Sequence, residues 1–196
     1  MAPELPELLV ADAAAWHGWL AAHHAESPGV WLVLTKKGGT VTALQYEDAV
    51  LEALCYGWID GQLRARDAAS SAIRFTPRRK GSRWSRSNVE RVARLEAEGR
   101  MTTAGRAAVD AAKADGRWQA AYGGAATAEV PDDLAAAIAA VPEAQAMFDV
   151  LTSTNRFAVV YRVTDVKRPE TRARKIAEFV AMLARHETPY PQKRRP

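Results

Sequence analysis

The residues best suited to chemistry lie in one stretch of the first half of the chain. They combine tryptophan, arginine and short polar side chains: Trp58, Asp60, Thr76, Arg78, Arg79, Trp84, Ser85 and Asn88. Arginine presents a planar fork of donors that matches carboxylate or phosphate, and tryptophan supplies a flat apolar wall. The sequence therefore predicts a pocket for an anionic or polar small molecule or peptide. In the alternative interpretation these residues are structural, with Trp58 and Trp84 in the core and Asp60 holding a turn.

Positive charge is concentrated in two segments. Residues 74–106 contain ten basic and three acidic residues, and residues 164–196 contain nine basic and four acidic. Such segments attract anions, either a small ligand or an acidic protein partner. The five basic residues of the loop at residues 78–86, together with Trp84, are also compatible with nucleic-acid binding. No helix-turn-helix, zinc-finger or RNP motif accompanies them, so nucleic acid is the weaker alternative.

An enzymatic role has less support. The sequence carries no nucleophile elbow, P-loop, dinucleotide fingerprint or HExxH motif. Asp60 is a weak candidate for a general base, provided that Trp58 shields it from water. The histidines lack the carboxylate pair that would complete a metal site. We expect neither a metal nor a cofactor.

Composition indicates a globular protein that does not span a membrane. Hydrophobic residues make up 48% of the chain and charged residues 26%, and no apolar run is long enough to cross a bilayer. The single cysteine, Cys55, excludes an internal disulfide. The acidic start of the chain does not resemble a secretion signal. We expect a cytoplasmic protein.

Strands are predicted in the first half only. They are residues 29–35 and the two strands of a hairpin, 62–66 and 71–76. Asp60-Gly61 predicts a tight turn just before the hairpin, and Pro77 is expected to end its second strand. The sheet is therefore expected to be small and antiparallel.

Helices are predicted along the whole chain. They are residues 12–23, 46–56, 87–99 and 102–116, then short helices from Pro131 and Pro142, residues 155–166, and a final helix with an apolar stripe from Ile176 to Leu183. Asp12 is expected as an N-cap, Gly57 as a C-cap, and Ser87 with Glu90 as a capping box. The fold class is α+β, with a small N-terminal antiparallel sheet and a helical C-terminal half. We expect an α+β region at residues 1–122 and a helical region at residues 131–188, packed as one unit.

Three motifs, in this order, resemble one known family. They are residues 52–61 (EALCYGWIDG), residues 75–79 (FTPRR) leading to Trp84-Ser85, and residues 167–172 (KRPETR). Together they resemble the YdeI/OmpD-associated family, also called bacteriocin-protection proteins, over roughly residues 29–186. The resemblance implies a bacterial protein that confers tolerance of antimicrobial peptides or bacteriocins. The family name also implies a porin association, from which a chain without a secretion signal departs.

The predicted function is therefore stress or antimicrobial protection through a ligand site lined by tryptophan and arginine. Two alternatives stay open: nucleic-acid binding through the loop at residues 78–86, and a small metal-independent enzyme with Asp60 as its base. The resemblance supplies no catalytic residues that would favour the enzyme.

Overall fold

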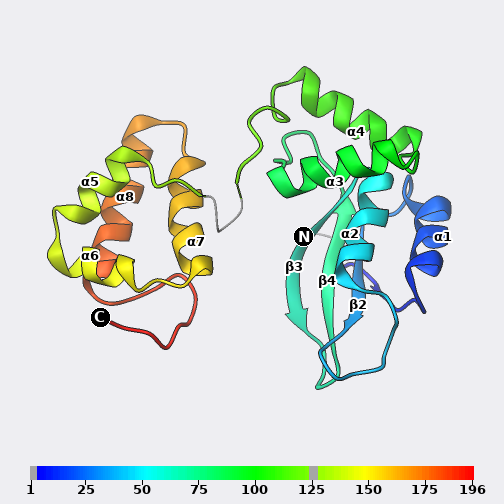
Figure 1. Ribbon diagram of the computed structural model, residues 1–196, viewed down its shortest axis with the longest axis horizontal. Coiled ribbons are helices and arrows are strands. Elements are labelled where there is room, and N and C mark those ends of the chain that lie inside the picture. Colours follow the sequence, from blue (N-terminus) through cyan, green and yellow to red (C-terminus); the bar gives the residue numbers. More distant parts are fainter. Residues whose placement is uncertain (1–3, 124–127) are drawn as a thin grey trace. The chain divides into compact units, whose positions relative to one another are not determined.

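A computed structural model describes residues 4–123 and 128–196 (Figure 1). The chain divides into two compact units, Met1–Ala121 and Tyr122–Pro196. Within the described residues, the first unit holds a sheet with four helices and the second holds four helices. The fold is thus α+β with a helical C-terminal half, as the sequence predicts.

Unit 1 is built around a four-stranded sheet of order β1-β2-β4-β3. Its strands are β1 (Glu7–Leu8), β2 (Val30–Thr35), β3 (Trp58–Ala65) and β4 (Ser70–Pro77). β4 pairs antiparallel with β2 and β3, as predicted, whereas β1 lies parallel to β2. β1 is not predicted from the sequence, because two residues are too few to show an alternating pattern.

Asp60 and Gly61 lie inside β3, so the tight turn predicted at this dipeptide is wrong. The chain stays extended from Trp58, and a register shift between Asp60 and Leu63 absorbs one extra residue as a bulge. The hairpin turn comes after Ala65, between the two strands that the sequence predicts as a hairpin. There the Asp67 carboxylate accepts hydrogen bonds from the backbone N–H groups of Ala69 and Ser70.

The helices of unit 1 are α1 (Ala13–His23), α2 (Tyr46–Cys55), α3 (Arg86–Ala97) and α4 (Thr103–Ala114). Gly57 follows α2 with a φ of +73°, which confirms it as the residue that ends this helix. The capping box predicted at Ser87 is wrong. Ser85 has the extended backbone of an N-cap, and its hydroxyl accepts from the Asn88 N–H. Ser87 already lies inside α3.

Unit 2 contains α5 (Asp132–Ala139), α6 (Pro142–Asp149), α7 (Ser153–Thr164) and α8 (Pro169–Ala184). α7 confirms the helix predicted over a segment rich in β-branched residues. Its Val159 and Val163 are fully buried in a core that includes Leu134, Met147 and Leu183. Tertiary packing therefore outweighs local strand propensity here. Within residues 4–123 and 128–196, none of the helices has the length and apolar character needed to cross a membrane.

Candidate functional site

Both tryptophans of the predicted site belong to the core of unit 1. Trp58 and Trp84 are each 1% exposed. Trp58 packs edge-on against Trp16 and Trp19, and its Nε1 donates to the His24 carbonyl at 3.1 Å. A ring buried to this extent cannot wall an open pocket, so the two indoles do not line a ligand site.

The basic loop after β4 is partly folded onto this core. The Arg78 guanidinium lies 3.6 Å from the centre of the Trp84 ring, and its Nη1 donates to the Arg83 carbonyl. Trp118 meets the Trp84 ring edge-on. Arg79 is exposed. The buried Trp84 thus offers no free face on which a nucleic-acid base could stack, which removes the aromatic half of the nucleic-acid interpretation.

Two further predicted residues serve the backbone. Ser85 is the N-cap of α3, and Thr76 lies in the β3–β4 ladder opposite Ile59.

Asp60 and Asn88 contribute to a polar cluster between β3, α2 and α3. The Tyr46 hydroxyl donates to Asp60 Oδ2 at 2.7 Å. Arg91 Nη1 donates to Asn88 Oδ1 at 2.9 Å, and Arg91 also binds Glu47 in a bidentate pair, Nε to Oε1 at 2.9 Å and Nη2 to Oε2 at 2.6 Å. Tyr46, Glu47 and Arg91 are not predicted as part of this cluster, because they are distant from Asp60 in the sequence and share no motif with it.

The charges of this cluster are locked in pairs. Burial, together with the hydrogen bond to Asp60, raises the pKa of Tyr46 well above its usual value, so its hydroxyl stays protonated. Hydrogen bonding to Arg91 lowers the pKa of Glu47. A recess of about 370 Å³ lies beside the cluster. It is lined by Glu47, Ser87, Glu90, Arg91 and Arg94. Because the Tyr46 hydroxyl stays protonated and donates its hydrogen bond to Asp60, this cluster does not support the prediction that Asp60 acts as a general base.

A second polar network ties α1 to α2. Glu52, 8% exposed, accepts from Arg100 Nη2 at 2.5 Å and lies 2.7 Å from His17 Nδ1. The other ring nitrogen of His17 lies 3.1 Å from the Tyr56 hydroxyl. Burial raises the pKa of Tyr56, so this hydroxyl is no nucleophile at neutral pH. In the part of the chain that the structure describes, no three His, Cys, Asp or Glu side chains are arranged to hold a metal.

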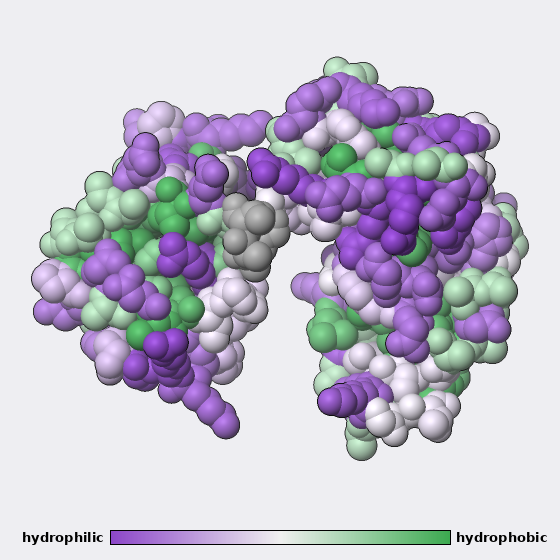
Figure 2. Space-filling model, in the orientation of Figure 1, coloured by the Kyte–Doolittle hydropathy of each residue, from purple (hydrophilic) through white to green (hydrophobic). Residues whose placement is uncertain are grey.

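Unit 2 contains an apolar groove of about 750 Å³ between α5 and α8. It is lined by Asp133, Ala137, Val141, Pro169, Arg172, Ala173, Ile176, Ala177, Val180, Ala181 and Ala184. Ala173, Ala177 and Ala181 are exposed and follow each other at four-residue spacing, so they form one stripe along α8. Figure 2 shows hydrophobic residues gathered on this unit over α5 and α8, with hydrophilic residues around them.

One end of the groove is fixed by Arg172. Its Nε and Nη2 bind the Asp133 carboxylate at 2.6 and 2.8 Å, and its Nη1 donates to the Val163 carbonyl at 2.8 Å. These bonds lower the pKa of Asp133. A single side chain thus joins α5, α7 and α8 and sets how far apart the walls of the groove lie at this end.

Two family models match the chain. The one described as "Domain of unknown function (DUF8412)" matches residues 8–108, just over half of the sequence. The chain belongs to this DUF8412 family. The model described as "Bacteriocin-protection, YdeI or OmpD-Associated" matches residues 127–186, which confirms the resemblance seen in the sequence for this segment. Searches of curated proteins and of solved structures find no match.

The two matches fall on different parts of this DUF8412 protein. The motifs at residues 52–61 and 75–85 lie in the DUF8412 segment, together with the polar cluster. The motif at residues 167–172 lies in the YdeI/OmpD-associated segment. Every residue that lines the apolar groove lies in that second segment as well. The groove therefore lies in the segment that matches a family model with a functional description.

Proposed function

We propose that this protein is a protection protein of the YdeI/OmpD-associated type that holds an amphipathic peptide in the groove between α5 and α8. The groove itself carries the proposal, because it lies inside the segment that matches a family described as bacteriocin-protection. Bacteriocins are peptides or proteins, so a peptide is the class of ligand that the family description suggests. The polar pocket expected around Trp58 and Trp84 has no part in this proposal, since both indoles are buried.

The dimensions of the groove suit a helix. α8 has 16 residues, which corresponds to about 24 Å of helix. Alanine side chains along one wall let a second helix approach to roughly the 8–10 Å between axes that is usual for packed helices. A peptide with large apolar side chains at i, i+4 and i+7 would insert them between α5 and α8. Burial of those side chains supplies the binding free energy.

Charges along the outer edge of α8 define the polar face of the ligand. Glu170, Arg174 and Glu178 follow each other at four-residue spacing, and Arg185 continues the row beyond the helix end. Arg174 Nε lies 3.8 Å from Glu178 Oε1, whereas Lys175 Nζ binds the other Glu178 oxygen at 2.6 Å, so it is Arg174 that keeps capacity for a partner. A row of alternating sign fits a peptide with both acidic and basic residues beside its apolar ridge better than a uniform polycation or polyanion.

Fluorescence anisotropy tests the proposal with a labelled designed peptide of about 16 residues, built as a leucine ridge flanked by lysine and glutamate. A scrambled peptide of the same composition, without the ridge, is the ligand control. Ala177→Glu places a charge in the groove, and Ala146→Glu places one at an exposed position of α6 outside it. Both positions are solvent-exposed, so circular dichroism is expected to show both variants folded.

We expect the helical peptide to bind the wild-type protein and the Ala146→Glu variant equally. Ala177→Glu is expected to weaken binding by at least about tenfold, because it desolvates a charge against the apolar ridge. The scrambled peptide is expected not to bind. Equal affinities for the two peptides, or equal effects of the two substitutions, would overturn the proposal.

We also propose that the protein acts in the cytoplasm. The single cysteine, Cys55, supports this location, because a protein of an oxidising compartment more often relies on disulfides. Fractionation of cells that express the full chain with a C-terminal epitope tests it. Recovery of the protein with periplasmic markers would contradict the proposal.

A further inference from the structure

The sheet of unit 1 presents a second face that carries no core helix. Leu32 of β2 and Ile73 of β4 belong to the core cluster with α1 and α2, and Figure 1 shows these helices beside the sheet. Because side chains alternate along a strand, Trp31, Val33 and Arg74 lie on the opposite face. None of these three belongs to that core cluster.

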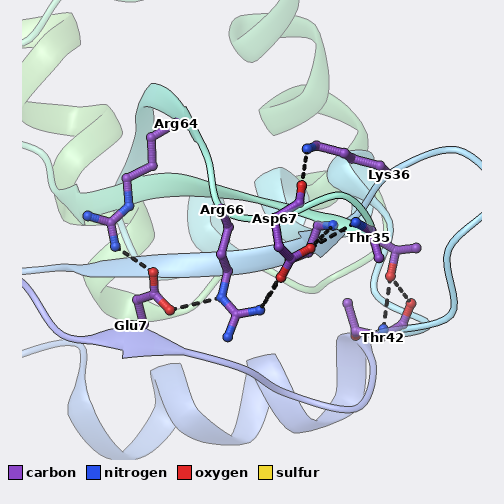
Figure 3. A network of polar contacts seen from close by, with 9 residues as sticks. Glu7, Thr35, Lys36, Thr42, Arg64, Arg66 and Asp67 are labelled. Carbon is purple, nitrogen blue, oxygen red and sulfur yellow. Dashed lines mark hydrogen bonds and ion pairs between the residues drawn. The ribbon is translucent and has the colours of Figure 1, made fainter.

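Arginine side chains cover much of this second face. β1 and β3 are the two edges of the sheet, yet Arg64 of β3 binds Glu7 of β1, Nη2 to Oε1 at 2.6 Å. The pair therefore spans β2 and β4, and the Arg64 guanidinium lies 4.2 Å from the centre of the Trp31 ring. Figure 3 shows the Glu7 carboxylate between Arg64 and Arg66, whose Nε binds its other oxygen at 3.0 Å. Glu7 is thus shared by two arginines.

Arg74 is the third arginine of this face, and it has no such partner. It is in register with Trp31, and it passes over Gly61, where a Cβ would lie 3.4 Å from its Nε. That Nε is buried without a hydrogen-bond acceptor. The Arg74 side chain makes no hydrogen bond or ion pair with any residue in the ranges 4–123 and 128–196. Its terminal nitrogens are the part of the group that is open to a ligand.

We propose that Arg74, beside Trp31, is a binding site for an oxyanion, the phosphate or carboxylate group of a small ligand. The terminal nitrogens of Arg74 carry positive charge without an acceptor among the described residues, and the arginine fork matches both kinds of oxyanion. Arg64 adds a second positive charge next to Trp31, and Glu7, the nearest carboxylate in the network, is already paired twice. This site is separate from the groove of unit 2 and does not depend on it.

Nuclear magnetic resonance of the full chain tests the site with three probes: inorganic phosphate, adenosine monophosphate and acetate, each against sodium chloride of equal ionic strength. We expect the Arg74 Nε–H and Trp31 indole N–H signals to shift on titration to about 10 mM, ten times the Kd of a millimolar site. Shifts with both phosphate probes but not acetate assign the site to phosphate, and the reverse assigns it to carboxylate. Absence of shifts with all three probes overturns the proposal.

Three substitutions separate a specific site from general positive charge. Arg74→Gln is expected to weaken binding of the effective probe by about tenfold. Arg79→Gln removes one charge from the exposed loop just after β4 and is expected to have less than about a twofold effect. Gly61→Ala places a methyl group in van der Waals contact with the guanidinium without removing its charge, and its effect is expected to fall between those of the other two substitutions. Equal losses in Arg74→Gln and Arg79→Gln, or no loss in Arg74→Gln, would show that Arg74 is no anion site.

Discussion

Gly105 allows α4 to cross the C-terminal end of α2 at backbone contact. A Cβ at this position would lie 2.2 Å from the Cys55 carbonyl oxygen and 2.9 Å from that of Leu54. The same carbonyl of Cys55 accepts from the Thr102 hydroxyl at 2.6 Å and from the Thr102 N–H at 3.2 Å. Substitution of Gly105 by alanine must therefore push α4 away from α2 and lengthen both hydrogen bonds.

The expected loss follows from these contacts. Overpacking costs about 1–3 kcal/mol, and two weakened hydrogen bonds cost about 1 kcal/mol each. The better helix propensity of alanine returns about 1 kcal/mol. Gly105→Ala is thus expected to lower the free energy of unfolding of unit 1 by roughly 2–4 kcal/mol. Gly18 of α1 is the matched control, because nothing lies within 4 Å of its Cβ position. Gly18→Ala is expected to raise stability by about 0.5–1 kcal/mol.

Urea unfolding followed by tryptophan fluorescence measures both variants. All six tryptophans lie in unit 1, so the signal reports this unit and not unit 2. A loss below about 1 kcal/mol in Gly105→Ala would mean that α4 and α2 are not in backbone contact, and the packing argument would be refuted. A loss of similar size in Gly18→Ala would refute the propensity argument.

Three further predictions concern single side chains. Ser85→Ala is expected to lower the free energy of unfolding of unit 1 by about 1 kcal/mol and Ser87→Ala by less than about 0.5 kcal/mol; equal losses in urea unfolding would contradict the assignment of Ser85 as the cap. Hydrogen bonds from Arg172 lower the pKa of Asp133 in the folded state, so the pair stabilises unit 2 above the unfolded-state pKa of about 3.9 and less as the pH falls below it. Thermal melts followed by circular dichroism are expected to show Asp133→Asn less stable than wild type at about pH 6 and the gap smaller at about pH 3; a gap that does not change with pH would contradict this. Burial raises the pKa of Cys55 to about 11, so a thiol reagent at pH 7 is expected to label it only after unfolding, and rapid labelling of the native protein would show that the thiol is accessible.

Elements whose signals are local could be predicted from the sequence. Asp12 caps α1, Gly57 ends α2 and Pro77 ends β4, because each effect depends on the backbone of near neighbours. The helix α7 is predicted only from its position between other predicted helices, because its own β-branched residues favour a strand. Packing of its valines in the core of unit 2 then decides for the helix.

The arrangement of the site could not be predicted in the same way. Tryptophan can form a pocket wall or a core, and only the packing of Trp58 on α1 decides for the core. Asp-Gly favours a turn, but both residues lie in β3, where pairing with β4 keeps the chain extended. The groove is formed by alanines such as Ala137 and Ala177 on helices that are distant in sequence. Alanine has no functional group that would mark a binding site in the sequence. That these alanines line one groove is therefore seen only in the folded structure.

A methyl spectrum of the full chain with ¹³C-labelled alanine, recorded with and without the designed peptide, tests the proposed peptide groove most directly. The proposal predicts shifts of the methyl signals of Ala137, Ala173, Ala177 and Ala181, which line the groove, and an unchanged signal from Ala146, an exposed residue of α6. Unchanged groove methyls at saturating peptide, or shifts of equal size at Ala146, would contradict it.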